Sequence, residues 1–207
     1  MSKVAIQGNA SGTGTFTIAA PNSNTDRTLT LPDEAGTVLT SASDLSGVTG
    51  AGGLFESYAV IADVKAYNAQ GGTATSGDYR TRDLNTEVTD PDGIVTLSSN
   101  QFTLGAGSYY IRWRCPAYKC GGHTTLLRNI TDSNNDAIGT AEYTDTAQNV
   151  QTLSEGSTRV SFASSKTFEI WHRVGVTKTT NGFGVSANDG GSTSNSVYTI
   201  VEIFKEA

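Results

Sequence analysis

Apolar and polar residues alternate with a period of two along most of the chain after residue 53. The stretch SYAVIADVKAY (57–67) shows the pattern, with Tyr58, Val60, Ala62 and Val64 on one face. Further runs of this kind occupy 94–97, 108–115, 124–130, 158–163, 167–174, 183–187 and 197–205. Roughly eight to ten short strands with no helical period predict an all-β fold, an antiparallel sandwich or jelly roll.

The run SYYIRWRC (108–115) predicts which side chains enter the core. Arg112 and Arg114 alternate with apolar residues, so they are expected to point away from the core. The predicted inward face consists of Tyr109, Ile111, Trp113 and Cys115.

The last run, VYTIVEIFK (197–205), is apolar on both faces. One face carries Val197, Val201 and Ile203, and the other carries Tyr198, Ile200 and Phe204. A strand of this kind is buried on both sides, within a sandwich or between subunits. We therefore expect the second face to meet another copy of the chain.

The first 40 residues carry fewer large side chains. Thr and Ser alternate there with short apolar pairs, of which the main ones are Phe16, Ile18, Leu29 and Leu31. Three short strands bury too little surface to be stable alone in water, so we expect them to take apolar partners from another chain or a larger particle. The Ser- and Gly-rich stretch at 41–53 is typical of a linker. The predicted division is 1–40, 41–56 and 57–207.

Composition narrows the function. The chain has 207 residues and a formal net charge of −6, and its Lys and Arg residues are scattered. A basic stripe that could follow phosphates is missing, so nucleic acid is not expected as a partner. The N-terminus lacks the apolar region of a secretory signal, and no apolar run approaches the roughly 20 residues of a membrane helix. We expect cytoplasmic synthesis without membrane insertion.

The two cysteines, Cys115 and Cys120, lie in RCPAYKCGG. A local disulfide and a pair of reduced, partly buried thiols are the two main alternatives. A zinc site would need both cysteines, His123 and a fourth ligand such as His172, but the Cys-x4-Cys spacing is loose for zinc. The two histidines are instead expected to be buried and hydrogen-bonded.

Other polar motifs favour turns over chemistry. DSNNDA (132–137) resembles half of a calcium loop, but Ala137 stands where an EF-hand needs Gly, which favours an Asx-rich hairpin turn. No nucleophile motif and no phosphate-binding glycine loop is found in a suitable context. The sequence therefore predicts no enzyme activity, no cofactor and no bound metal.

Two resemblances add to this interpretation. SGTGTFTIAAPNSNTDRTLTLPDEAGTVLT, within residues 8–42, resembles a segment that recurs in bacteriophage tail fibres and related virion proteins. Residues 58–205 resemble the trimeric jelly roll of complement-C1q and tumour-necrosis-factor type that such fibres carry at their tips. The matching phrases are FTLGAGSYYIRW (102–113), LLRNITDSNNDAIGTAEY (126–143), SKTFEIWHRV (165–174) and TNGFGVSAN (180–188).

The resemblances imply a homotrimer with an N-terminal attachment segment and a C-terminal knob. Phe16, Ile18, Leu29 and Leu31 would then attach the segment to other virion proteins or to each other. Tyr198, Ile200 and Phe204 become candidates for the trimer core.

In such a jelly roll the first and last strands are neighbours, so the loops at 69–83 and 188–196 should lie at the end far from the termini. Loops there usually carry binding residues. The candidate receptor contacts are Tyr79, Arg80, Arg82, Asp189 and Asn195. The alternative is that these loops are solvated turns whose arginines pair with Asp78 or Asp83.

The function expected from these features is host attachment. The chain would be a virion structural protein, a short trimeric tail fibre whose knob binds a glycan or protein receptor on the bacterial surface. The alternative is a capsid decoration (cement) protein or head fibre that stabilises the particle without binding a receptor. Either way we expect the protein to be made in the host cytoplasm and exposed on the virion.

Overall fold

The computed structural model describes residues 11–14, 22, 24–26, 28, 53–187 and 194–207. The chain divides into two compact units, Met1–Ser43 and Asp44–Ala207. In the first unit, the described residues are exposed to solvent. The predicted attachment residues Phe16, Ile18, Leu29 and Leu31, and the loop residue Asp189, lie outside the described residues, so their roles stay predictions.

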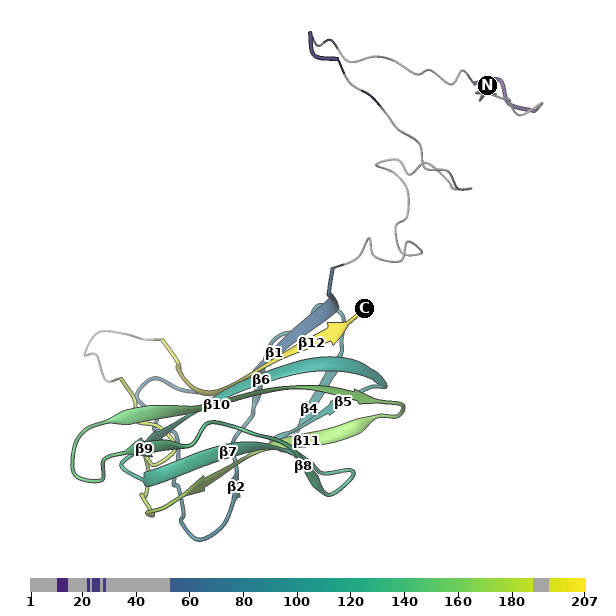
Figure 1. Ribbon diagram of the computed structural model, residues 1–207. Helices are drawn as coiled ribbons and strands as arrows, with labels where there is room; N and C mark the ends of the chain where they lie inside the picture. The colour runs from purple at the N-terminus through teal and green to yellow at the C-terminus, as the bar shows by residue number, and fades with distance from the viewer. Residues whose placement is uncertain (1–10, 15–21, 23, 27, 29–52, 188–193) are drawn as a thin grey trace. The chain divides into compact units, whose positions relative to one another are not determined.

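The second unit is an antiparallel β-sandwich of two sheets (Figure 1), which confirms the predicted fold class. The five-stranded sheet has the order β10-β6-β12-β1-β3, and the seven-stranded sheet has the order β4-β5-β11-β7-β8, with β2 on β11 and β9 on β7. The strands are β1 (Phe55–Lys65), β2 (Arg80–Thr81), β3 (Thr86–Thr89), β4 (Val95–Ser98), β5 (Gln101–Leu104), β6 (Gly107–Tyr118), β7 (Gly121–Asn129), β8 (Asn134–Ile138), β9 (Glu142–Thr144), β10 (Gln151–Phe162), β11 (Lys166–Val174) and β12 (Ser196–Glu206). None of the described residues forms a helix, and so none forms one that could cross a membrane.

The pairing of the first and last strands defines two ends of the sandwich. Phe55 lies opposite Glu206, and Lys65 lies opposite Ser196. We call the end with Phe55 and Glu206 the base, and the opposite end the far end. The segments that follow β1 and precede β12 therefore start and finish at the far end, as the sequence predicts.

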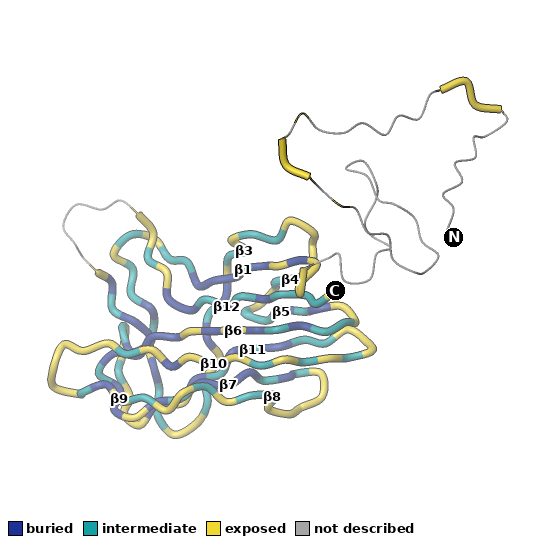
Figure 2. Tube along the Cα trace, turned by 45° about the horizontal axis from the view of Figure 1, so that its top comes forward, coloured by how far each residue is buried: buried dark blue, intermediate teal, exposed yellow. Residues whose placement is uncertain are grey.

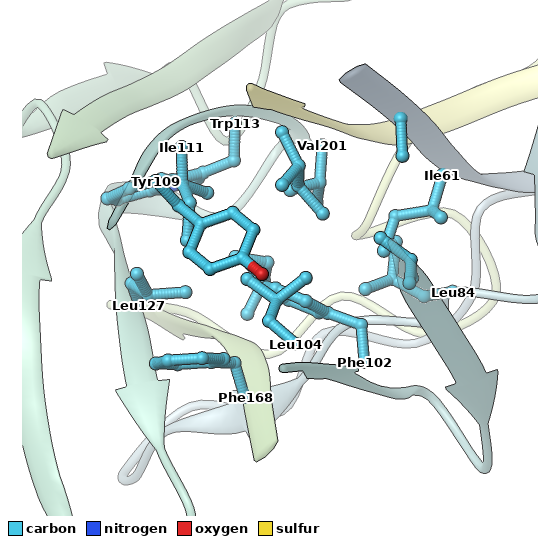
Figure 3. Close-up of a cluster of buried hydrophobic side chains, with 14 of the residues drawn as sticks. Ile61, Leu84, Phe102, Leu104, Tyr109, Ile111, Trp113, Leu127, Phe168 and Val201 are labelled. Atoms are coloured by element: carbon cyan, nitrogen blue, oxygen red, sulfur yellow. The ribbon is translucent and has the colours of Figure 1, made fainter. Parts of the chain in front are cut away.

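The core lies between the sheets and follows the predicted alternation. In β6 the residues Tyr109, Ile111, Trp113 and Cys115 are buried, while Arg112 and Arg114 are exposed. Figure 3 shows Tyr109, Ile111 and Trp113 of β6 facing side chains of the opposite sheet, among them Leu127 and Phe168. The apolar core consists of Ala59, Ile61, Leu84, Val95, Phe102, Leu104, Tyr109, Ile111, Trp113, Cys115, Leu127, Phe168, Ile170, Val201 and Ile203.

Gly156 accommodates the largest of these side chains. It lies directly opposite Trp113 in the pairing of β10 with β6. A Cβ atom at this position would come within 2.1 Å of the indole ring. The indole nitrogen of Trp113 in turn donates to the Thr125 hydroxyl at 2.8 Å, which satisfies its buried N–H.

Two predictions about the last third of the chain are wrong. Residues 183–187 do not form a strand, because the backbone there bonds to loop residues: Phe183 N–H donates to the Gly72 carbonyl, and Gly71 N–H donates to the Gly184 carbonyl. Tyr198 does not share the outer face of β12, because a bulge between Ala62 and Val64 in the pairing with β1 shifts the alternation.

As a result Tyr198 is buried and its hydroxyl donates to the Ala69 carbonyl, whereas Val197 is half exposed. Tyr198 is therefore part of the protomer's interior and not a trimer-core residue. Farther along β12 the predicted faces are correct, since Val201 and Ile203 point inward and Ile200 and Phe204 remain partly exposed. The place of Ile200 and Phe204 in a trimer core stays a prediction. Figure 2 shows burial concentrated in the strands and exposure concentrated in the loops.

Candidate binding surfaces

The far end carries a hollow between the segment after β1 and the start of β12. Its volume is about 570 Å³, and its lining combines polar and apolar surface, with Tyr67, Gln151, Ser186 and the predicted Asn195 among its residues. Gln151 accepts a hydrogen bond from Val185 N–H. The structure thus places Asn195 in a concave surface at the end that the sequence predicts.

Arg82, predicted to be a receptor contact, is instead buried, with 1% of its surface exposed. Its guanidinium donates to the Thr199 hydroxyl at 2.8 Å, the Pro116 carbonyl at 3.2 Å and the Phe183 carbonyl at 2.9 Å. It also lies 4.3 Å from the centre of the Phe183 ring. Arg82 therefore joins three segments at the far end and is not available to a partner.

Two histidines lie beside Arg82 and complete a polar cluster. His123 Nδ1 and His172 Nε2 are 3.0 Å apart, and His123 Nε2 is 2.8 Å from the Thr152 hydroxyl. Burial, reinforced by the Arg82 charge, lowers the pKa of His123 to about 4 although Glu142 opposes the shift. Burial, with Arg82 and His123, lowers the pKa of His172 well below its usual value. We call Arg82, His123, His172 and Phe183 the far-end cluster.

Both cysteines are free buried thiols, so of the two alternatives the structure has the reduced pair. Cys115 points into the core from β6, and burial raises its pKa to about 11. Cys120 lies in the following turn, where its Sγ donates to the Tyr118 and Gly182 carbonyls. Within the part of the chain that the structure describes, no group of three His, Cys, Asp or Glu side chains could hold a metal ion.

The calcium-like motif is a hairpin turn that leads into β8. Ser133 has a φ of 57°, and the strand begins at Asn134. The two aspartates accept hydrogen bonds from Asn129, and Asp132 also pairs with Lys166 at 2.6 Å. Protein groups thus satisfy the carboxylates, as expected for the turn interpretation.

Tyr79 and Arg80 lie at the surface of the seven-stranded sheet. Arg80 is exposed in β2, which pairs with β11. Tyr79 is half-buried, and its ring centre lies 6.1 Å from that of Trp171. Arg128 lies 4.9 Å from the Trp171 ring and Arg173 lies 6.0 Å from the Tyr79 ring. We call Tyr79, Arg80, Arg128, Trp171 and Arg173 the Trp171 patch.

Sequence reasoning found Tyr79 and Arg80 but missed the other three residues of this patch. The missed signal is in TFEIWHRV, where Phe168, Ile170, His172 and Val174 form the buried face. Trp171 and Arg173 fall on the alternate, outer face. A tryptophan on the polar side of an alternating strand is the informative observation, because large aromatic residues there are not needed for the core.

The outer face of the five-stranded sheet carries a different group of aromatic residues. The ring of Phe55 lies 5.1 Å from that of Phe204 and 6.5 Å from that of Tyr110. Tyr58 pairs with Phe204 across the β1–β12 ladder and is 47% exposed. We call Phe55, Tyr58, Tyr110 and Phe204 the aromatic face. The predicted Ile200 lies on the same side of β12.

A second exposed apolar group follows the edge formed by β8, β9 and β10. It consists of Ile138, Tyr143, Val150 and Leu153, with exposed fractions from 41% to 68%. We call this group the apolar edge. The residues come from segments that pack together, since Thr140 N–H donates to the Glu155 carbonyl and Ser154 donates to the Thr140 carbonyl.

Comparison with known proteins gives similarity at the level of structure. The globular domain of zebrafish complement 1qA is 12% identical, with a TM-score of 0.47, over 72% of this chain and 97% of that chain. Murine APRIL at pH 5.0 is 6% identical, with a TM-score of 0.47, over 72% of this chain and 98% of that chain. Murine APRIL at pH 8.0 is 7% identical with a TM-score of 0.44 over the same shares.

No protein-family model matches the sequence, and no curated protein matches it. The strand order itself defines the fold of the chain as an antiparallel jelly-roll sandwich.

Proposed function

We propose that the chain is a bacteriophage virion protein, a short homotrimeric tail fibre whose knob binds the surface of the bacterial host. The observation that carries the proposal is the aromatic face. Four aromatic side chains gather on the outer side of a sheet whose inner side already forms the core. Contiguous exposed apolar surface of this kind marks an interaction site.

The apolar edge suggests what the aromatic face meets. The two surfaces lie on different parts of the sandwich, so contact between the face of one copy and the edge of the next is heterologous. A heterologous contact closes into a ring when its rotation permits. The C1q- and tumour-necrosis-factor-type resemblance of residues 58–205 implies a ring of three.

Such a ring would leave the far-end loops and the outer face of the seven-stranded sheet to solvent. Three copies of a weak site then bind a surface with high avidity, because the second and third contacts form at a high effective concentration. The virion assignment is supported by the tail-fibre-like phrase within residues 8–42.

The assembly is tested by sedimentation equilibrium of the whole chain, with an expected mass of three times 21.6 kDa. Phe204→Asp places a charge on the aromatic face and Ile138→Asp places one on the apolar edge, and each should give monomers. Val176→Asp is the control, since Val176 is an exposed apolar residue that belongs to neither surface. A monomeric wild-type protein would contradict the proposal.

Host attachment is tested by competition. The purified trimer is added to host cells before infection, and the rate of virion adsorption is measured. Saturable binding with slower adsorption supports the fibre. A well-formed trimer that neither binds cells nor competes would overturn host attachment and favour the capsid decoration protein.

A further inference from the structure

The Trp171 patch gathers arginine side chains that have no carboxylate partner. In the described residues, ion pairs are formed by five other cations, Lys65, Arg112, Arg159, Lys166 and Lys205. Within these residues, Arg82, Arg114, Lys119 and Lys178 form none. Arg80, Arg128 and Arg173 form none within the same described ranges. A chain with a net charge of −6 therefore keeps two guanidinium groups without an ion pair, those of Arg128 and Arg173, beside one pair of aromatic rings.

The carboxylates nearest to the patch are engaged by neutral groups. Glu169 accepts hydrogen bonds from Thr81, Gln101 and the Trp171 indole nitrogen. Asp78 accepts one from Tyr79 N–H. Glu169 thus holds the indole in a fixed orientation. Arg128 lies opposite Glu169 in the pairing of β11 with β7 and donates to Asn135 at 3.0 Å. Arg173 is exposed to solvent and open to an anion from outside.

The aromatic rings give the patch a second chemical character. Trp171 and Tyr79 lie side by side on the outer surface, each with an arginine near its ring. Arginine fits carboxylate and phosphate groups through paired N–H donors. Aromatic rings offer a rigid apolar surface with a polar edge, which suits the C–H face of a sugar ring. The combination fits a sugar chain that carries anionic groups.

Other ligand classes fit less well. A neutral sugar would use the rings but leave the arginines without partners. A nucleic acid strand needs a positively charged groove that follows its backbone, whereas the arginines of this patch form a compact group that does not extend along a groove. Local charge complementarity therefore favours a short anionic stretch of a polysaccharide.

We propose that the Trp171 patch binds a bacterial surface polysaccharide that carries carboxylate or phosphate groups. The inference rests on the proposed function and names the receptor class that the knob recognises. Tyr79 and Trp171 support the sugar rings, and Arg128 and Arg173 bind the anionic groups. Arg80, at the edge of the patch, contributes charge.

Binding of the whole chain to three immobilised polymers tests the inference. They are alginate, which carries carboxylates, a poly(ribitol phosphate) teichoic acid, which carries phosphates, and dextran, which is neutral. We expect binding to at least one anionic polymer, weaker binding at higher salt, and no comparable binding to dextran. A preference between the two anionic polymers identifies the anionic group.

Variants locate the binding site. Tyr79→Ala and Arg173→Gln should each weaken binding about tenfold, as expected for anchor residues of an interface. Lys166→Gln is the control, because it removes one positive charge from the same strand, at the base, where Lys166 already pairs with Asp132. It should bind like the wild type. Arg128→Gln gives a second test on the neighbouring strand.

The inference would be overturned if the chain bound all three polymers equally or bound none of them. It would also be overturned if the Tyr79, Arg128 and Arg173 variants kept the affinity of the wild type. These outcomes differ from failure of the proposed function. If the trimer binds host cells but the patch variants bind them equally well, the fibre stands and this site is wrong. If the wild-type trimer binds no cells, host attachment itself fails.

Discussion

The two ends of the sandwich are held together by different physics. Toward the base, apolar side chains such as Phe102, Phe168 and Ile203 fill the space between the sheets. At the far end a smaller apolar cluster, made of Ala74, Ala117, Cys120, Val174 and Phe183, lies beside buried polar groups. There the Arg82 guanidinium joins β12 to the loop at Phe183, and two neutral histidines connect β7, β11 and β10. Apolar burial stabilises the whole domain, whereas directed hydrogen bonds fix the positions of particular segments. The hydrogen-bonded groups at the far end therefore hold its segments in a fixed geometry.

The largest effect is expected from a substitution in the apolar core. Phe168 packs against Phe102 and Phe162, with ring centres 5.5 and 5.8 Å away. Phe168→Ala should lower the free energy of unfolding by about 4 kcal/mol, because it removes buried apolar surface and leaves a cavity. Chemical denaturation measures this. A loss below about 1 kcal/mol would show that the core tolerates cavities. It would contradict the view that apolar packing toward the base stabilises the whole domain.

A smaller and more local effect is expected at Arg82. Arg82→Leu leaves the Pro116 and Phe183 carbonyls without their donor, so the free energy of unfolding should fall by about 3 kcal/mol. Hydrogen exchange should rise first in the segments that Arg82 joins and much less at the base. In the Phe168→Ala variant the increase should spread through both sheets. Identical exchange patterns in the two variants would mean that the ends are not distinct.

The most gradual effect is a dependence on pH, which is small for each step in pH. The folded pKa of His123 is about 4 and that of His172 is also lowered, against an ordinary value of 6.5. Between those values the unfolded chain binds more protons, so the free energy of unfolding falls as the pH drops below about 6.5. The slope is at most about 1.4 kcal/mol per pH unit for each histidine. Above about pH 7.5 the histidines add almost no slope, because they are then neutral in the unfolded chain as well.

Denaturation at several pH values checks this expectation. The double variant with His123→Gln and His172→Gln should lose this part of the slope, whatever its absolute stability. An unchanged slope in that variant would assign the pH dependence to other groups.

The apolar core could be predicted from the sequence because the alternation of apolar and polar residues indicates which side chains of a strand are buried. The period of two placed Tyr109, Ile111, Trp113 and Cys115 inside, and the structure confirms it. Short strands such as β2 and β9 were missed, since two or three residues cannot show a period. The prediction that Tyr198 lies on the outer face was wrong because a bulge shifts the register of β12. The sequence contains no clear signal of that bulge.

The far-end cluster could not be predicted for a different reason. Arg82 lies between β2 and β3, where no period exists, and an arginine beside Gly-rich loops is usually at the surface. Its burial depends on carbonyl groups from Pro116 and Phe183, distant in the chain. Local pattern cannot reveal such partners, because they come together only when the fold has formed.

The pairing of β1 with β12 also has a mechanical consequence. β1 is bonded along its length, from Phe55 opposite Glu206 to Lys65 opposite Ser196. A force that is applied at Phe55 and resisted at the far end of the sandwich acts parallel to the strands. The ladder hydrogen bonds of an antiparallel pair are perpendicular to that direction, so they are loaded in shear and share the force. A particle tethered through the residues before Phe55 would therefore strain many bonds together and would not open them one after another.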